Sequence, residues 1–226
     1  MNLKNMTFPS PATAAGINLL TSADYSFPED GKNGIILYGP YGTGKSTCAE
    51  LLPAEIEAKH STEAALIRYE ECSPNNNGVA LLSSIRTQIS LVPTCGELHY
   101  VILDEVDNLT HDAMKQLKST MNRRYGSQHH DAVFIMTTNH LDKIDEGVIK
   151  RSRLVSFEPM NENVWIPLAR QTLQAKGVDV SNVTDRFIRT RIIAKGNNPR
   201  DILDNCKETA YLLKTNPQWQ VIAGQP

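Results

Sequence analysis

The sequence has 226 residues, of which 40% are hydrophobic and 21% charged, and its formal net charge is −2. These values are ordinary for a globular protein with a sizeable core, and the lack of net positive charge argues against a protein that coats nucleic acid through bulk charge. No apolar run approaches the ~20 residues that span a bilayer, and the N-terminus has no apolar segment typical of a secretory signal, so we expect a cytoplasmic protein without membrane contact.

The distribution of cysteines also favours a cytoplasmic protein. The four cysteines are widely spaced and contain no C-x-x-C pair. Scattered cysteines of this kind favour reduced, packed thiols of an intracellular protein over a disulfide framework. They are Cys48, Cys72, Cys95 and Cys206.

Residues 1–158 are expected to form one α/β domain, which opens with an extended arm over residues 1–13. Short apolar runs predict strands, and apolar residues three to four positions apart predict helices. The predicted strands cover residues 35–38, 64–69, 99–103, 132–137 and 154–157, and the predicted helices cover 14–20, 48–52, 79–91 and 111–123. Strands that alternate with helices predict a parallel five-stranded sheet flanked by helices on both faces.

The pattern changes after residue 158. Residues 159–214 show three helical stretches and no strand, so we expect a small all-α domain. Its helices are predicted at 164–176, 185–195 and 199–214. The last helix has a strong start signal, because Asn198 can cap it and Pro199 suits the first helical position. Residues 215–226 contain two prolines and a glycine and are expected to form a flexible tail.

A glycine-rich segment between the first strand and the next helix carries the clearest functional signal. Residues 39–46 read Gly-Pro-Tyr-Gly-Thr-Gly-Lys-Ser and fit the pattern G-x-x-x-x-G-K-[ST]. In such a loop the glycines let backbone N–H groups surround a phosphate, Lys45 reaches the β- and γ-phosphates, and Ser46 binds Mg²⁺. The alternative is a glycine-rich turn that contains Lys-Ser by chance. The expected nucleotide-binding residues are Gly39, Pro40, Tyr41, Gly42, Thr43, Gly44, Lys45, Ser46 and Thr47.

Two carboxylates follow the third strand, at Asp104 and Glu105. The carboxyl ends of parallel strands share one edge of the sheet, and the glycine-rich loop leaves a strand at the same edge. Asp104 is therefore suited to hold Mg²⁺, and Glu105 is suited to polarise an attacking water. The alternative is an ordinary acidic turn. Asn139 follows the fourth strand and could orient that water or contact the γ-phosphate, or simply end the strand.

Together these motifs resemble the AAA+ ATPases, and specifically the small subunits of sliding-clamp loaders, over residues 30–205. Residues 39–46 are similar to that family's G-P-P-G-T-G-K-[ST]. Residues 104–107, Asp-Glu-Val-Asp, match its D-E-A-D-type box. Asn139 falls on the family's sensor 1. The resemblance therefore implies ATP and Mg²⁺ as cofactors and an AAA+ fold with a helical lid.

The resemblance also implies arginines that complete the site. In the family, a serine-arginine-cysteine motif supplies an arginine finger to the neighbouring subunit, and residues 150–154, Lys-Arg-Ser-Arg-Leu, stand in its place here. Ungapped spacing from both flanking motifs places the finger on Arg151, whereas the local Ser-Arg pair favours Arg153. The sensor 2 pattern G-x-x-R is shifted by one residue and points to Arg200.

The function implied is an ATP-hydrolysing module in DNA replication, with sites completed between self or related AAA+ subunits in a ring or spiral. DNA and a sliding clamp or another replication protein are the expected partners. Arg86, Lys115 and Lys118 are candidate DNA contacts, with ordinary surface charges as the alternative. Clamp-loader subunits usually continue into a helical collar, which we do not expect because the sequence ends after the lid.

Two other functions remain open. The same module serves in helicase loaders, initiators and transposition ATPases. A nucleotide-gated scaffold with little turnover belongs to a different class of protein. Glu105 argues against the scaffold, because a pure switch does not require a carboxylate that activates water.

Overall fold

The computed structural model describes residues 3–28, 31–122, 132–159, 162–196 and 198–224. The chain divides into two compact units. The first comprises residues 1–5, 12–40 and 45–157, and the second comprises residues 6–11, 41–44 and 158–226. Each unit has its own secondary structure and its own apolar core.

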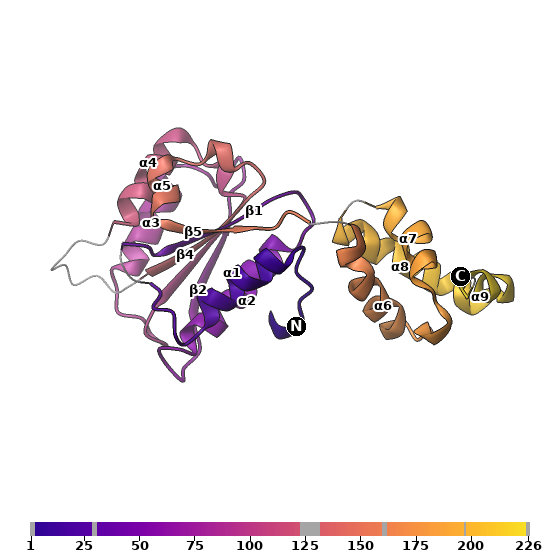
Figure 1. Ribbon diagram of the computed structural model, residues 1–226. Coiled ribbons are helices and arrows are strands. Elements are labelled where there is room, and N and C mark those ends of the chain that lie inside the picture. The colour runs from indigo at the N-terminus through magenta and orange to yellow at the C-terminus, as the bar shows by residue number, and fades with distance from the viewer. Residues whose placement is uncertain (1–2, 29–30, 123–131, 160–161, 197, 225–226) are drawn as a thin grey trace. The chain divides into compact units, whose positions relative to one another are not determined.

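The first unit is built on a five-stranded parallel sheet (Figure 1). Its strands are β1 (Gly34–Tyr38), β2 (Leu66–Glu71), β3 (His99–Asp104), β4 (Ala132–Thr138) and β5 (Ser152–Ser156). Their order across the sheet is β2-β3-β4-β1-β5. The predicted fold class is therefore confirmed. The strand order was not predicted, and it places β3 and β1 on either side of β4.

Helices cover both faces of this sheet. The helices α1 (Pro11–Thr21) and α2 (Lys45–Glu57) lie on one face, and α3 (Val79–Ile89), α4 (His111–Thr120) and α5 (Glu146–Lys150) lie on the other (Figure 1). Single-turn 3-10 helices occur at η1 (Leu3–Asn5), η2 (Val106–Asn108) and η3 (Leu141–Lys143). Among the described residues, no helix is long and apolar enough to cross a membrane.

The three inner strands, β1, β3 and β4, are buried along nearly their whole length because both faces of the sheet are covered. Successive side chains of a strand point to opposite faces, so the side chains of β1, β3 and β4 pack into two layers of the apolar core, one on each face of the sheet. The layer under α3, α4 and α5 contains Ile36 of β1 and Leu117 of α4, both fully buried. Every residue of β4 is buried, in agreement with its position in the middle of the sheet.

The second unit consists of helices in the described part of the chain. They are α6 (Ile166–Ala175), α7 (Asp185–Arg191), α8 (Pro199–Thr215) and α9 (Pro217–Ala223), with 3-10 turns η4 (Glu162–Trp165), η5 (Val180–Asn182) and η6 (Ile193–Lys195). Asn198 caps α8 as expected, because its Oδ1 accepts the Asp201 N–H at 3.1 Å. A buried cluster that includes Trp165, Leu173 and Ile202 forms the core of this unit.

Several sequence expectations were wrong. The extended arm does not reach residue 13, because α1 begins at Pro11 and buries Thr13, whose hydroxyl donates to Ser156 O at 2.6 Å. Proline is favourable in the first turn of a helix, so Pro11 begins α1 and the arm is shorter than expected. The second strand lies two residues later than predicted, over Leu66–Glu71, because charged residues also occur in a strand at the edge of a sheet.

The expected flexible tail is also wrong over most of its length. Residues 217–223 form α9, with Pro217 in its first turn and Asn216 accepting the Gln218 N–H at 3.0 Å. Trp219 packs edge-on against Phe187, with ring centroids 6.2 Å apart. The prolines of this segment therefore start a helix that packs on the rest of the second unit.

Candidate nucleotide-binding site

The glycine-rich segment joins the end of β1 to the start of α2. Three of its glycines have positive φ: 142° at Gly39, 74° at Gly42 and 94° at Gly44. Residues with a side chain rarely adopt such φ values, which explains the glycines of the pattern. α2 then begins at Lys45, and because the first N–H groups of a helix have no partner within the helix, the start of α2 is suited to bind an anion.

Lys45 is buried at the end of β1, where three oxygen atoms accept hydrogen bonds from its ammonium group. Nζ donates to Gly39 O at 2.8 Å, to Pro40 O at 2.7 Å and to Asn139 Oδ1 at 2.8 Å. Burial lowers the pKa of Lys45 to about 8, and nearby carboxylates, chiefly Asp104, partly oppose this shift. The added negative charge of a phosphate would favour the protonated form of Lys45.

Asp104 ends β3, and its carboxylate is the centre of a cluster of hydroxyl groups. Ser46 Oγ donates to Asp104 Oδ1 at 2.8 Å, and Thr137 Oγ1 makes a second, short hydrogen bond to the same atom. The hydroxyl of Tyr69 donates to Oδ2 at 2.8 Å. Hard cations such as Mg²⁺ prefer oxygen ligands, so the adjacent oxygens of Ser46 and Asp104 fit this ion.

Tyr69 and Thr137 were not identified from the sequence. They lie inside strands, and only the pairing of β2 and β4 with β3 brings them to Asp104. Partial burial, the hydrogen bond to Asp104 and nearby carboxylates raise the pKa of Tyr69 above its usual range, so its hydroxyl stays a donor.

Glu105 follows Asp104 with an unusual backbone. It has φ 56° and ψ 50°, the left-handed region, and it is the only non-glycine residue with positive φ in the described part of the chain. Its N–H donates to Thr137 Oγ1 at 3.0 Å, and its Oε2 accepts Asn108 Nδ2 at 3.1 Å. Strained residues of this kind concentrate at functional sites.

The structure thus brings five of the predicted site residues to one edge of the sheet: Lys45, Ser46, Asp104, Glu105 and Asn139. They come from the start of α2, which follows β1 and the loop, and from the ends of β3 and β4. Direct hydrogen bonds join Lys45 to Asn139 and Ser46 to Asp104.

The two candidate finger arginines are not at this edge. Arg151 precedes β5, and its carbonyl accepts the Gly34 N–H at the start of β1. Four residue steps of about 3.3 Å place that point roughly 13 Å from the end of β1. Its guanidinium group donates to Gly147 O at 2.6 Å and to Asn122 Oδ1 at 2.7 Å. Arg153 lies in β5 with its guanidinium group 5.1 Å from the centre of the Tyr25 ring.

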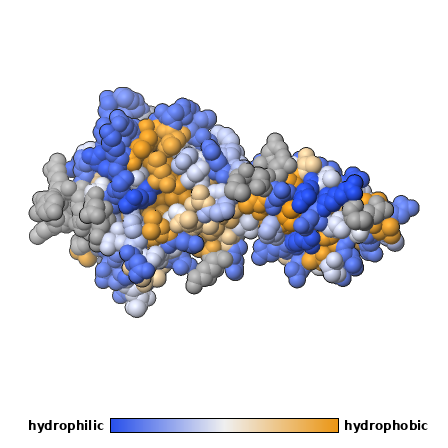
Figure 2. Space-filling model, in the orientation of Figure 1, coloured by the Kyte–Doolittle hydropathy of each residue, from blue (hydrophilic) through white to orange (hydrophobic). Residues whose placement is uncertain are grey.

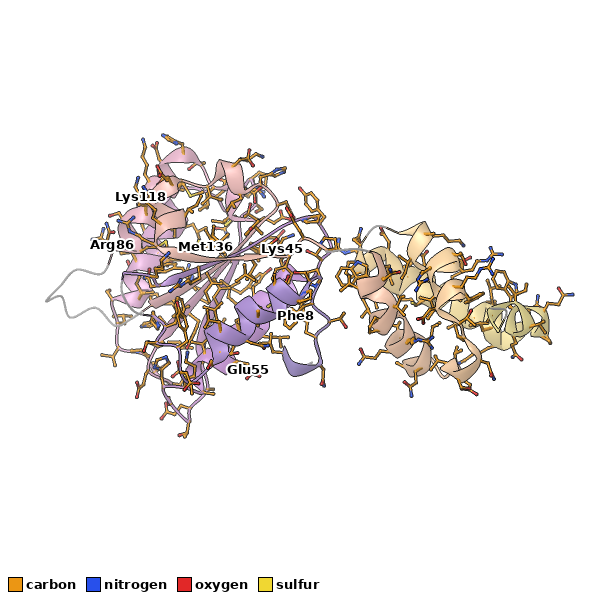
Figure 3. All side chains as sticks on the ribbon, in the orientation of Figure 1. Phe8, Lys45, Glu55, Arg86, Lys118 and Met136 are labelled. Carbon is orange, nitrogen blue, oxygen red and sulfur yellow. The ribbon has the colours of Figure 1, made fainter. Side chains whose placement is uncertain are left out.

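The other charged candidates lie elsewhere. Arg200 is an exposed residue in the first turn of α8, in the second unit. Arg86 of α3 is exposed, whereas Lys118 of α4 donates to Asp145 Oδ2 at 3.0 Å. Lys115 lies 3.5 Å from Asp112 and is largely exposed. Arg86 and Lys118 lie away from Lys45, toward the other end of the first unit (Figure 3).

Residues 35–160 match the family described as "ATPase family associated with various cellular activities (AAA)". The replication factor C small subunit 1 of Pyrobaculum arsenaticum is 27% identical over 148 residues, which are 65% of this chain and 43% of that protein. The replication factor C small subunit of Saccharolobus solfataricus is 29% identical over 130 residues, or 57% of this chain and 37% of that protein. The chain therefore spans less than half the length of these curated relatives.

Solved structures show the same fold. A structure of RuvB from Thermotoga maritima aligns with a TM-score of 0.73 and 13% identity, and covers 98% of this chain and 70% of that one. The replication initiator DnaA, bound to AMPPCP and single-stranded DNA, aligns with a TM-score of 0.63 and 15% identity, and covers 95% of this chain and 65% of that one. At these identities the likeness concerns the fold alone.

Proposed function

This chain belongs to the family of ATPases associated with various cellular activities, and we propose that it binds Mg·ATP at residues 39–47 and hydrolyses ATP as a clamp-loader-like module of DNA replication. The observation that carries the proposal is the meeting of Lys45, Ser46, Asp104, Glu105 and Asn139 at one edge of the sheet. Lys45 supplies a positive charge suited to phosphates, and Ser46 and Asp104 supply oxygen ligands suited to a metal ion. The Glu105 carboxylate lies beside these groups.

Each residue has a role that follows from its position. Lys45 exchanges its contacts with the loop carbonyls Gly39 O and Pro40 O for phosphate oxygens. Ser46 and Asp104 would hold Mg²⁺, and the ion would offset the negative charge of the phosphates. Glu105 accepts the proton of the attacking water. Asn139, already in contact with Lys45, orients that water or the terminal phosphate.

We further propose that the site is completed by a neighbouring subunit. Arg151 lies roughly 13 Å along β1 from the loop of its own chain, so it is placed to serve a different chain. Apolar surface is visible over the first unit in Figure 2. Leu154 of β5, three residues from Arg151, is 43% exposed. Exposed apolar surface beside a finger candidate supports a protein interface there. Arg153 is the second finger candidate, and Arg200 is proposed as the sensor 2 residue of a helical lid over residues 159–214.

The relatives named replication factor C small subunit favour a role in loading a sliding clamp on DNA, with related subunits as partners. A helicase loader or initiator is the second candidate, favoured only by the fold shared with DnaA. A nucleotide-gated scaffold would bind ATP at the same site with little turnover.

One measurement separates these functions. The mass of the assembly is determined by light scattering without nucleotide, with a non-hydrolysable ATP analogue, and with the analogue plus primed DNA, while phosphate release is followed with ATP. Nucleotide-dependent assembly with ATP turnover stimulated by primed DNA is expected. Assembly without turnover would favour the scaffold. A chain that stays monomeric and ignores primed DNA would contradict the proposed function.

A further inference from the structure

Tyr69 lies outside every motif of the sequence, yet its hydroxyl donates to Asp104 Oδ2 at 2.8 Å. It belongs to β2, the edge strand beside β3, and is 44% exposed. The strand register pairs Tyr69 with Ile102 and Glu71 with Asp104. Tyr69 and Asp104 are therefore diagonal neighbours on the same face, a separation that a long aromatic side chain can bridge.

The carboxylate of Asp104 is held from both neighbouring strands. Thr137 of β4 donates to Oδ1 on one side, and Tyr69 of β2 donates to Oδ2 on the other. Ser46 also donates to Oδ1. One donor on one oxygen leaves a carboxylate free to rotate about that contact. Donors on both oxygens fix the plane of the group.

We propose that Tyr69 is a positioning residue for the metal site, because its hydroxyl holds the Asp104 carboxylate in the orientation that faces Ser46. The inference rests on the proposed function, in which Ser46 and Asp104 hold Mg²⁺. When the Ser46 oxygen binds the ion, Asp104 still needs donors that keep its orientation. Thr137 and Tyr69 then remain, and Tyr69 is the one that acts on Oδ2. Residues that hold a metal ligand in place typically change metal affinity about 10- to 100-fold when they are lost.

The test measures nucleotide binding, so it does not depend on turnover. Tyr69→Phe keeps the ring and removes the hydroxyl. Binding of a fluorescent ATP analogue is measured in EDTA and then across a Mg²⁺ titration. We expect unchanged affinity in EDTA and a rise of about 10-fold in the Mg²⁺ concentration for half-maximal enhancement of binding. A residue needed only for the fold would weaken binding equally with and without Mg²⁺, and that result would overturn the proposal.

Two further variants make the result decisive. Tyr211→Phe removes the hydroxyl of a tyrosine in α8 that is 67% exposed, and it should leave both curves unchanged. Asp104→Asn tests the metal ligand itself. If Asp104→Asn shifts the Mg²⁺ curve and Tyr69→Phe does not, the role of Tyr69 is refuted and the metal site stands. If Asp104→Asn also leaves the curve unchanged, the metal site is refuted and the role of Tyr69 with it.

Discussion

Ser46 and Asp104 are 58 residues apart in the sequence, and the Ser46 hydroxyl donates to Asp104 Oδ1 at 2.8 Å. This hydrogen bond joins the first turn of α2 to the end of β3. The two side chains that the proposed function assigns to Mg²⁺ are thus brought together by the protein fold itself. Preorganised ligands of this kind reduce the ordering that binding requires.

Lys45→Ala is expected to abolish ATP binding. The substitution removes the ammonium group that lies against Gly39 O, Pro40 O and Asn139, and with it the full positive charge that faces the phosphates. Binding is measured by titration with a fluorescent ATP analogue, and circular dichroism checks that the variant is folded. Tight ATP binding by a folded Lys45→Ala protein would refute the assignment of the phosphate loop.

Glu105→Gln is expected to keep ATP binding and to slow hydrolysis at least ~100-fold, the scale of a lost general base. The amide is close in size to the carboxylate and can keep a contact with Asn108, so the backbone of this strained residue is preserved. Single-turnover phosphate release checks the rate, and assembly with ATP should be prolonged. Unchanged turnover would exclude Glu105 as the group that activates water.

Much of the fold could be predicted because the strands are short apolar runs separated by helical periodicity. The strand order could not, since it depends on which strands pair across the sheet. The end of the chain shows a second limit. Pro217 looks like a helix breaker in isolation, but in the structure it starts α9, and Trp219 packs on Phe187. Contacts between distant segments decided that outcome.

The residues of the candidate site likewise divide into those that a local sequence pattern marks and one that no local pattern marks. The position of Lys45, Ser46, Asp104 and Glu105 at one edge of the sheet could be predicted because each lies at the end of an element, where a local pattern marks it. Tyr69 could not be found, because nothing in its own strand distinguishes it from a packed aromatic residue. Its role depends on the register between β2 and β3, and a single sequence does not reveal register.

The DNA candidates should behave differently from one another. Arg86 is exposed on α3, so Arg86→Ala should weaken binding to DNA of any base sequence. The slope of log affinity against log salt concentration should also fall by about one, because one fewer counterion is released from the DNA. Lys118 instead pairs with Asp145, which caps the N-terminus of α5, and the hydrogen bond from Lys118 lowers the pKa of Asp145. Lys118→Ala should therefore lower the unfolding temperature more than Arg86→Ala does.

Fluorescence anisotropy at several salt concentrations, with ATP analogue present, measures the first effect, and thermal unfolding measures the second. DNA binding that ignores both nucleotide and salt would contradict this prediction. An equal loss of DNA affinity in both variants, with unchanged unfolding temperatures, would instead assign Lys118 to the DNA contact as well.

Cysteine reactivity should report the packing of both units. Burial raises the pKa of Cys48 and Cys72 to about 12 and that of Cys206 to about 11, whereas Cys95 is only half-buried. Because thiolates are the reactive form, a pKa near 11 leaves only about one thiol in 1,000 ionised at pH 8. A thiol reagent at pH 8 should label one cysteine quickly in the native protein and the other three only after unfolding. The Cys95→Ser protein should show no fast phase, and a fast phase in that variant would contradict the packing.

Arg151 is expected to act on the ATP site of a neighbouring subunit. Phosphoryl transfer spreads negative charge over the terminal phosphate, and an arginine that stabilises this charge from outside contributes about 10³–10⁵ in rate. Arg151 lies beside the start of β1, at the end of the strand opposite the loop, and therefore cannot serve its own site. In the separate chain its guanidinium group contacts Gly147 O and Asn122, and these contacts would be exchanged for phosphate in an assembly.

The experiment compares Arg151→Ala with Arg153→Ala and then mixes variants. Arg151→Ala should retain ATP binding and lose hydrolysis, and Arg153→Ala should lose less, because Arg153 contacts the Tyr25 ring. Arg151→Ala and Lys45→Ala have their defects on opposite sides of an interface, so a mixed assembly contains some complete sites and should recover part of the activity. Thermal unfolding checks that losing the Gly147 contact has not unfolded α5. If the two folded variants assemble together and recover no activity, the finger does not lie at Arg151, and a larger loss in Arg153→Ala would place it there.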